Sequence, residues 1–364
     1  MKKRLCIIVP NHWSHVMGGS PYESKVLIET LNKLNRYEIF YLTKQIGSDY
    51  IPEGYQLKSI KGGKTRRYGE FSNAFSLLKL LKEIKPDIIY QLVAGANTGV
   101  ASYYCKHNKC NMVWRIQHDH DVSPPGWKFS KIPLFSYIDN RILDYGIRNA
   151  TYIVAQSQLQ MDLMEKYYGR RADIIIPNFH PAPPEDILKE KPIKVAWVAN
   201  LKEWKRPEIF VRLANDLQHL KGVEFQMCGK PSMQNYQELK SRIDVLDNLT
   251  HYGECTQDEV NQLLAKAHIF VNTSMHEGFP HTYMQSWMRK VPVVSLEINP
   301  DGIFDSGLLG YYADGDYEKM KAYVVQLVEE NNLRKNIGDS AQKYAFDHFS
   351  AESQVDRLME IFEK

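Results

Sequence analysis

The stretch that most constrains the fold is residues 269–297, whose pattern indicates a strand, a loop, a helix and a second strand in succession. Residues 269–273 form a short β-branched and aromatic run that is typical of a buried strand. Pro280 suits the first turn of a helix, because a proline there gives up no hydrogen bond. We therefore expect the loop 275–280 at the carboxyl end of a strand, where open α/β sheets bind ligands.

Two features of this loop favour a polar ligand. The backbone N–H groups at the start of the following helix are free to bind an anion. Glu277 supplies an ionisable group next to Gly278, which lets a ligand approach the backbone closely. Strands and helices alternate along the rest of the 364 residues as well, which predicts parallel sheets in more than one domain.

The run Glu277-Gly278-Phe279-Pro280 and the later segment V-P-V-V at 291–294 resemble the family-4 retaining glycosyltransferases of the GT-B fold. The segments T-Y-I-V-A-Q-S at 151–157 and D-I-I-I-P-N at 173–178 also match, so that the resemblance covers nearly the whole chain. Two positions depart from the family pattern: the second glutamate is Gln285, and the glycine before the last strand is Lys290.

The resemblance implies an α/β protein of two facing Rossmann-like domains with a cleft between them. It assigns residues 1–185 to an acceptor-binding domain and residues 186–348 to a nucleotide-sugar-binding domain, with a proline-rich connector at 179–184. Residues 349–364 are expected to form a last helix that crosses back to the first domain.

The resemblance also implies roles for residues of the second domain. Lys205 falls on the lysine that neutralises the donor diphosphate, and positive charge there stabilises the leaving group. The family arginine is replaced by Asn200, so Lys202 and Arg206 are candidates to compensate. The donor loop gives further predicted contacts: Glu277 to sugar hydroxyls, Gln285 to the ribose, and Gly278, Phe279 and Pro280 to the rest of the donor.

In the first domain the resemblance points to two residues. The glycine-rich loop after strand 5–10 is not a G-x-G-x-x-G fingerprint, and the family reading brings Gly19 near the donor phosphates. The strand at 112–117 delivers His118, which matches the family histidine that reaches the donor sugar. A simple glycine turn and a structural histidine remain the alternatives.

No metal or cofactor is expected beyond the UDP- or GDP-linked sugar donor. The run His118-Asp119-His120-Asp121 offers ligand-type residues, but alternate side chains of a strand point to opposite faces. Cys105, His107 and Cys110 match no common zinc spacing. GT-B enzymes, moreover, do not need the carboxylate-bound metal of other glycosyltransferases.

The predicted function is a metal-independent, retaining transfer of a hexosyl-type sugar to a hydroxyl of a glycan or lipid-linked glycan, as in bacterial surface polysaccharide assembly. Three alternatives stay open. The departures at Asn200 and Gln285 are compatible with a weakened family member that acts as a binding or scaffold subunit. Another GT-B enzyme, an epimerase or a phosphorylase, is the second alternative. A nicotinamide dehydrogenase is the third, and the missing fingerprint disfavours it.

Charge and cysteine usage bear on partners and location. Residues 1–186 hold 25 Lys and Arg against 17 Asp and Glu, while the remainder holds 21 against 26. The excess in the first part suits an anionic partner, either an acidic acceptor or a membrane surface, and a flexible basic loop adds to it through Lys61, Lys64, Arg66 and Arg67. A loop that is merely solvated is the equal alternative.

Nucleic acid is not an expected partner, because the basic segments lack interleaved stacking residues. The five cysteines form no C-x-x-C motif, and no run of about 18 apolar residues occurs. We therefore expect a cytoplasmic protein with buried free thiols, loosely attached to the inner membrane face.

Overall fold

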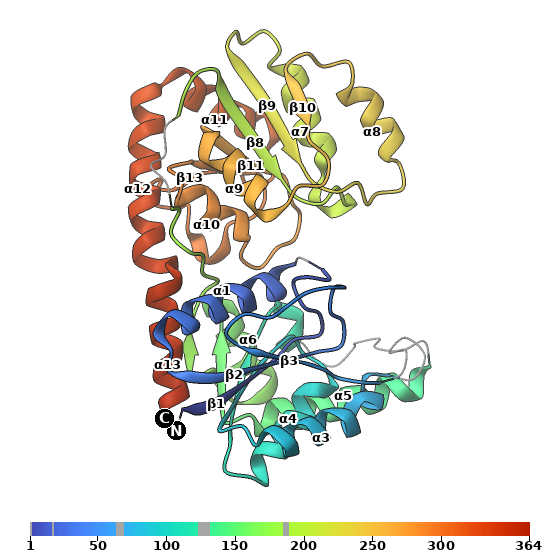
Figure 1. Cartoon of the computed structure of the whole chain (residues 1–364). Helices are drawn as coiled ribbons and strands as arrows, with labels where there is room; N and C mark the ends of the chain where they lie inside the picture. The colour runs from blue at the N-terminus through green and yellow to red at the C-terminus, as the bar shows by residue number, and fades with distance from the viewer. Residues whose placement is uncertain (1, 17, 63–68, 123–131, 185–188) are drawn as a thin grey trace. The chain divides into compact units, whose positions relative to one another are not determined.

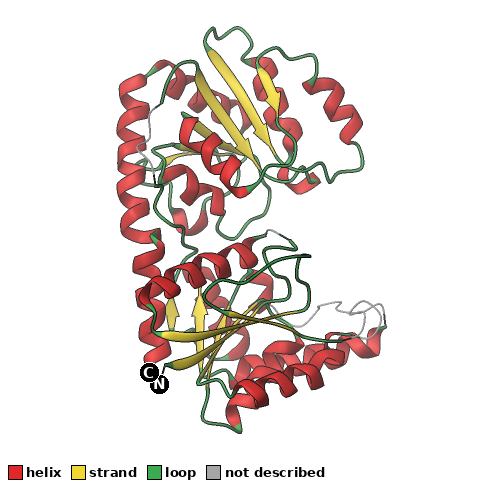
Figure 2. Cartoon of the chain, viewed as in Figure 1, coloured by secondary structure: helices red, strands yellow, loops and turns green. Residues whose placement is uncertain are grey.

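The computed structural model describes residues 2–16, 18–62, 69–122, 132–184 and 189–364. The chain forms two compact units, unit 1 from Met1–Phe179 with Ala351–Lys364 and unit 2 from His180–Ser350. Each unit contains one parallel sheet with helices against it (Figures 1 and 2). The predicted alternation of strands and helices in two α/β domains is confirmed.

The described part of unit 1 has a sheet in the order β3-β2-β1-β4-β5-β6-β7. Its strands are β1 (Lys3–Ile8), β2 (Tyr37–Thr43), β3 (Gln56–Ser59), β4 (Ile88–Leu92), β5 (Asn111–Arg115), β6 (Tyr152–Ala155) and β7 (Ile174–Ile175). Its helices are α1 (Gly19–Leu34), α3 (Ala74–Ile84), α4 (Ala96–Lys106), α5 (Pro133–Asn149), α6 (Gln158–Tyr168) and α13 (Ala351–Glu363), with short 3-10 turns η1 (Glu70–Asn73) and η2 (Asp119–Val122).

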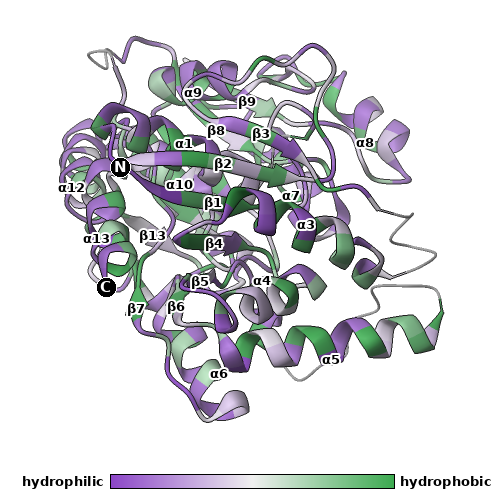
Figure 3. Ribbon diagram, turned by 60° about the horizontal axis from the view of Figure 1, so that its bottom comes forward, coloured by the Kyte–Doolittle hydropathy of each residue, from purple (hydrophilic) through white to green (hydrophobic). Residues whose placement is uncertain are grey.

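The central strands of this sheet are apolar on both faces, as parallel strands covered by helices must be. Along β1, Leu5 and Ile7 belong to one core cluster, whereas Cys6 and Ile8 belong to the other. Helices such as α3 and α5 bury one side and expose the other, and Figure 3 shows hydrophilic and hydrophobic residues alternating along α5. The hydrophobic patterns of the sequence therefore account for both layers of helices.

The last helix, α13, completes the core of unit 1. Val355, Leu358 and Phe362 lie in the same cluster as Leu5 and Ile7. The Tyr37 hydroxyl donates to the Glu363 carboxylate at 2.6 Å, and the Arg357 guanidinium donates to the Ile175 carbonyl at 2.8 Å.

The described part of unit 2 has a sheet in the order β10-β9-β8-β11-β12-β13. Its strands are β8 (Ile193–Val198), β9 (Val223–Cys228), β10 (Leu249–His251), β11 (Ile269–Asn272), β12 (Val293–Ser295) and β13 (Gly310–Tyr312). Its helices are α7 (Pro207–Asp216), α8 (Tyr236–Ile243), α9 (Gln257–Lys266), α10 (His281–Trp287), α11 (Tyr317–Glu329) and α12 (Asn331–Phe349), with short 3-10 turns η3 (Glu203–Lys205) and η4 (Pro300–Gly302).

Several local predictions need correction. Helix α1 begins at Gly19, and the residue before it, Gly18, has an extended conformation and is the N-cap. Gly19 was expected in the loop but lies in the first turn of the helix. The edge strands β3 and β13 and the helix α8 carry weak patterns, and the sequence did not predict them. Cys228, expected as a free thiol, is joined to Cys255 in a disulfide.

Candidate functional site

The candidate site of unit 2 lies where the order of strands in its sheet reverses. From β8 the chain adds β9 and β10 on one side, and then returns to add β11, β12 and β13 on the other. Strands β8 and β11 are parallel neighbours, so the loops that leave their carboxyl ends emerge side by side. Ligands of open α/β sheets bind at such a reversal point.

These two loops bring Lys205 and Glu277 together. The Lys205 ammonium lies 2.8 Å from Glu277 Oε2, and both side chains are about four fifths buried. The second carboxylate oxygen, Oε1, accepts a hydrogen bond from Asn272 Nδ2 at 3.1 Å. Asn272 is itself fixed, since its Oδ1 accepts from the Ser274 backbone N–H. A cation and an anion, 72 residues apart in sequence, are thus preorganised at the edge of the sheet.

Hydrogen bonds fix the two loops relative to each other. The Thr273 hydroxyl lies 2.6 Å from the Lys205 carbonyl oxygen and accepts a hydrogen bond from the buried Trp197 indole at 2.9 Å. The Met275 backbone N–H donates to the Trp204 carbonyl at 2.8 Å. The position of the Lys205 side chain is therefore set by the core of unit 2 and not by the surface loop alone.

Arg206 makes contacts within the protein that the sequence did not predict. It adopts a left-handed conformation, with φ of 49°, at the start of α7. Its guanidinium contacts the Glu297 carboxylate at 2.6 Å and the Thr273 carbonyl at 2.7 Å. Because Glu297 follows β12, Arg206 cross-links the loops after three neighbouring strands.

Lys202 and Asn200 lie on the same loop. The Lys202 ammonium sits 4.8 Å from the ring centre of Trp204, an exposed aromatic side chain. Asn200 Oδ1 accepts from the Lys230 backbone N–H at 3.3 Å, beside the end of β9. Gly229 permits this approach, since a Cβ there would lie 1.7 Å from the Ala199 carbonyl oxygen.

The remaining predicted residues of the loop 275–280 and of α10 differ in exposure. Gly278 is exposed. Phe279 packs its ring 5.1 Å from Phe349 and so anchors the loop to the core of unit 2. Pro280 starts α10, as expected. Gln285, on α10, is only 3% exposed and donates to Asn261 Oδ1 at 3.2 Å.

In unit 1 the strand order reverses between β1 and β4, and Gly19 lies in the first turn of α1, which follows β1. A buried ion pair fixes this helix. Glu23 of α1 lies 2.5 Å from Arg115 of β5, and burial raises the pKa of the Glu23 carboxyl although Arg115 opposes the rise. Arg115 also donates to the Ile176 carbonyl at 2.9 Å, just before unit 1 gives way to unit 2.

His118 lies exposed just beyond β5. Its backbone N–H donates to Asp121 Oδ2 at 3.1 Å, and the same oxygen accepts from the Gln117 backbone N–H at 2.8 Å. Burial raises the pKa of the Asp121 carboxyl, against the effect of these hydrogen bonds and of nearby His118. Asp121 therefore shapes the turn that presents His118.

The basic loop is described only in part. Lys61 is exposed, whereas Lys64, Arg66 and Arg67 lie outside the described residues. Among the described residues, His, Cys, Asp and Glu nowhere form a group of three that could hold a metal ion. The described helices include none that is long and apolar enough to cross a membrane.

The residues that sequence reasoning missed are those that position the predicted ones. Asn272 is the last residue of β11 and Thr273 follows it, whereas Asp121 lies in η2, a few residues beyond the end of β5. Val93, after β4, has φ of 70°, which is strained for a β-branched residue. Such strain concentrates at functional sites. For Asn272, Thr273 and Asp121, the signal available in the sequence was a polar residue at or beyond the end of an apolar strand.

Comparison with known proteins gives a consistent result. Residues 182–344 match the family model described as glycosyl transferases group 1. A poly(ribitol-phosphate) alpha-N-acetylglucosaminyltransferase of Staphylococcus aureus (strain COL) is 22% identical over 358 residues, which cover 92% of this chain and 68% of that protein. An alpha-galactosylglucosyldiacylglycerol synthase of Streptococcus pneumoniae is 21% identical over 64% of this chain and 67% of its own length.

Solved structures share the whole architecture. Sucrose-phosphate synthase from Thermosynechococcus elongatus aligns with a TM-score of 0.74 at 11% identity, covering 100% of this chain and 98% of that one. A mutant of S. aureus TarM in complex with fondaparinux, alpha-GlcNAc-glycerol and UDP aligns with a TM-score of 0.73 at 12% identity, covering 100% of both chains. At these identities the likeness shows a common fold.

Proposed function

We propose that this chain, whose residues 182–344 match the family model of the glycosyl transferases group 1 and which has the GT-B fold, transfers a sugar from a nucleoside diphosphate to a hydroxyl of a glycan or glycolipid, with retention of anomeric configuration and without a metal. The observation that carries the proposal is the Lys205–Glu277 pair at the reversal point of the unit 2 sheet.

The pair supplies the two charges that this reaction needs. Lys205 holds the diphosphate, whose bridging oxygen gains negative charge as its bond to the sugar breaks, and a preorganised cation lowers that barrier. Glu277 accepts hydrogen bonds from the donor sugar hydroxyls. The exposed Gly278 leaves the backbone beside it open to the ligand.

The bond changes balance without a further reactant. The bond between the anomeric carbon and the diphosphate oxygen breaks, and its electron pair stays on the diphosphate. The acceptor hydroxyl oxygen forms the new bond on the same face, and its proton passes to the departing oxygen. No catalytic base is required, in keeping with the ammonium partner that Glu277 already has.

The acceptor class follows from charge and from the relatives. Residues 1–186 carry the excess of positive charge. By their names, one of the relatives above acts on poly(ribitol-phosphate) and the other synthesises a diacylglycerol glycolipid. An anionic or lipid-linked glycan of a cell surface is accordingly the acceptor that we propose.

The test is release of nucleoside diphosphate from a panel of UDP- and GDP-linked sugars, with and without chelator and with lipid-linked and polyanionic acceptors. We expect release from one donor class that persists in chelator, and a product whose anomeric proton coupling matches that of the donor. An inverted product, or release that chelator abolishes, would refute the retaining, metal-independent reaction.

A weakened, ligand-binding family member is the second candidate, because Asn200 supplies no charge and Gln285 is buried. That candidate predicts UDP or GDP binding by calorimetry without release from any donor. Restoring both family residues by Asn200→Arg and Gln285→Glu would then raise the release of diphosphate above background.

A further inference from the structure

Unit 1 brings two of its free cysteines into contact where α4 ends and β5 begins. Cys105 is the last but one residue of α4, and Cys110 stands directly before β5. Their Sγ atoms lie 3.0 Å apart, with the Cys105 thiol donating a hydrogen bond to the Cys110 sulfur. We call these two side chains the thiol pair. Because His118 follows the carboxyl end of β5, the thiol pair lies at the opposite edge of the sheet from the candidate site.

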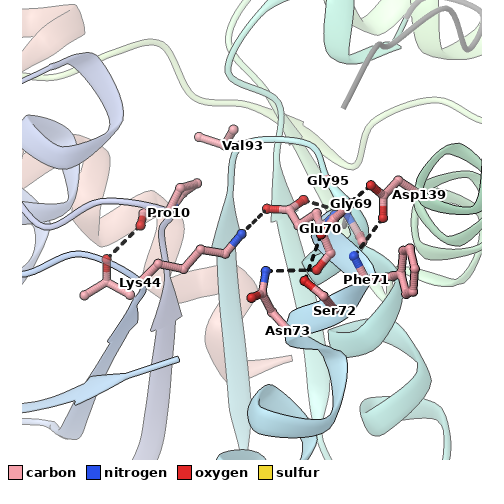
Figure 4. A network of polar contacts seen from close by, with 12 residues as sticks. Pro10, Lys44, Gly69, Glu70, Phe71, Ser72, Asn73, Val93, Gly95 and Asp139 are labelled. Carbon is pink, nitrogen blue, oxygen red and sulfur yellow. Dashed lines mark hydrogen bonds and ion pairs between the residues drawn. The ribbon is translucent and has the colours of Figure 1, made fainter. Parts of the chain in front are cut away.

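Contacts at the start of α4 set the position of this helix. The Glu70 carboxylate accepts a hydrogen bond from the Ala96 backbone N–H at 2.8 Å. The same carboxylate forms an ion pair with Lys44 at 2.8 Å (Figure 4). Gly95 makes room for it, because a Cβ there would lie 2.0 Å from Glu70 Oε2. The helix that carries Cys105 is therefore anchored to the carboxyl edge of the sheet by its first turn.

Hydrogen bonds also fix the turn between the two cysteines. The Asn108 side chain donates to the Tyr104 carbonyl at 2.7 Å, at the end of α4. The Cys110 backbone N–H donates to the Asn108 carbonyl at 2.8 Å, and the Asn111 backbone N–H donates to the Asp87 carbonyl at 2.9 Å. Both sulfurs are thus placed by ordered backbone. A disulfide bond is about 2.05 Å long, so a shift of about 1 Å would bring them to bonding distance.

The two thiols differ in accessibility and in protonation. Cys105 is only 6% exposed, whereas Cys110 is partly exposed. The hydrogen bond to Cys110, together with burial, raises the pKa of the Cys105 thiol above its usual range. The turn also carries three exposed basic residues, Lys106, His107 and Lys109, and partial exposure beside positive charge is typical of reactive cysteines. Cys110 is therefore the sulfur that an oxidant reaches first.

We propose that the thiol pair is a site of reversible oxidation, at which a hydroperoxide converts Cys105 and Cys110 to a disulfide. The Cys110 sulfur attacks one peroxide oxygen and the O–O bond breaks. The departing oxygen takes up the thiol proton, which leaves Cys110 as a sulfenic acid. The Cys105 sulfur then attacks the Cys110 sulfur, and the hydroxide that leaves takes the Cys105 proton as water. Two electrons pass from the two sulfurs to the peroxide.

The second thiol decides whether this oxidation can be reversed. A sulfenic acid without a neighbouring thiol is open to further oxidation to sulfinic acid, which is irreversible for most proteins. A disulfide, in contrast, returns to two thiols by exchange with a dithiol reductant. Cys6, the third free cysteine, is fully buried in β1, and burial raises the pKa of its thiol well above the usual range. Cys6 should therefore stay reduced.

The test is peptide mapping of the full chain after treatment with hydrogen peroxide, alkylation in denaturant and digestion with trypsin without reduction. Trypsin cleaves after Lys106 and Lys109, so a disulfide of the thiol pair joins two peptides that are otherwise separate. We expect the joined peptide as the main oxidation product of the wild type and its loss on treatment with dithiothreitol. Cys6 should be recovered alkylated. None of these measurements depends on the proposed transfer reaction.

Three variants separate the roles of the sulfurs. In Cys105→Ser, the yield of Cys110 sulfinic acid should rise at least fivefold over the wild type. In Cys110→Ser, Cys105 should be oxidised at least tenfold more slowly than Cys110 is in the wild type. Cys6→Ala is the matched control, since it removes the remaining free thiol and should leave the yield of joined peptide unchanged.

Two results with the wild type alone would overturn the proposal. One is recovery of Cys110 chiefly as sulfinic acid, or of a disulfide that includes Cys6. The other is full recovery of both thiols at a peroxide dose that oxidises an equal concentration of free glutathione in a parallel sample.

Discussion

Replacing Glu277 should lower turnover, while nucleotide affinity should stay constant or increase. Glu277→Ala deletes a carboxylate that is proposed to contact only the sugar and that pairs with Lys205 at 2.8 Å. Turnover should fall by about 2–4 kcal/mol of transition-state stabilisation, roughly 30- to 900-fold. Affinity for free UDP or GDP should stay constant or improve, because Lys205 is released to the diphosphate.

The size of that improvement follows from the pair itself. At 2.8 Å, Coulomb's law gives about 6 kcal/mol in a medium of dielectric constant 20 and about 1.5 kcal/mol in bulk water. After desolvation, a hydrogen bond to a charged group contributes about 1.5–3 kcal/mol. In the wild type, a bound diphosphate draws Lys205 partly away from Glu277, so that only part of the energy of the Lys205–Glu277 contact is lost on binding. We therefore expect Kd in the variant between the wild-type value and about tenfold tighter.

Calorimetry with UDP and GDP, together with release of diphosphate from the preferred donor, measures both effects. Glu277→Gln keeps the shape of the side chain and an oxygen for Asn272, so it should reproduce the gain in affinity. Glu203→Gln is the matched control, since it removes an exposed acid from the loop that carries Lys205. Affinity that falls tenfold in a folded Glu277→Ala variant, or turnover within fivefold of wild type, would refute the reasoning.

Three further outcomes follow. Gln285→Glu buries a carboxylate and should lower Tm without ligand, yet should show a larger rise in Tm with UDP than the wild type, because a carboxylate accepts from both ribose hydroxyls; an unchanged rise would place the ribose elsewhere. Burial lowers the pKa of His12 and of His268 to about 4 and that of His180 to about 3. As the pH drops from 6.5 to about 4, the unfolded chain therefore binds more protons than the folded one, and the free energy of unfolding measured in urea should fall. A profile that does not change with pH would contradict these lowered pKa values. Thiol titration of the denatured, unreduced protein should count Cys6, Cys105 and Cys110, and five thiols would mean that Cys228 and Cys255 are not joined.

Much of the fold was predictable, since the central strands are near-continuous apolar runs such as that around Cys6 and the helices that follow them are amphipathic. Among the edge strands of the described sheets, β3 and β13 were not. Strand β3 reads Q-L-K-S, because an edge strand exposes most of its side chains and needs no apolar run. Helix α8, with its many polar residues, was missed for the same reason.

For the candidate site, the sequence predicted single residues but not which of them are in contact. Lys205 and Glu277 were chosen separately from motif positions, and the structure places them in contact because β8 and β11 are neighbours, which the order of strands along the chain does not reveal. Arg206 was predicted as a spare cation for the donor. Its partner, Glu297, follows a third strand, and only the sheet topology makes that pairing visible.

The composition of unit 1 from both ends of the chain has a consequence for biosynthesis. Its sheet is made from residues that leave the ribosome early, but its core includes Val355, Leu358 and Phe362. Domains generally fold as units during synthesis. Unit 2 is continuous in sequence and can complete its core before α13 is synthesised, whereas unit 1, most of which emerges earlier, must wait for α13. A nascent chain that stalls before residue 355 therefore leaves an unfilled apolar face on unit 1, and chaperones are expected to bind that face until α13 has been synthesised.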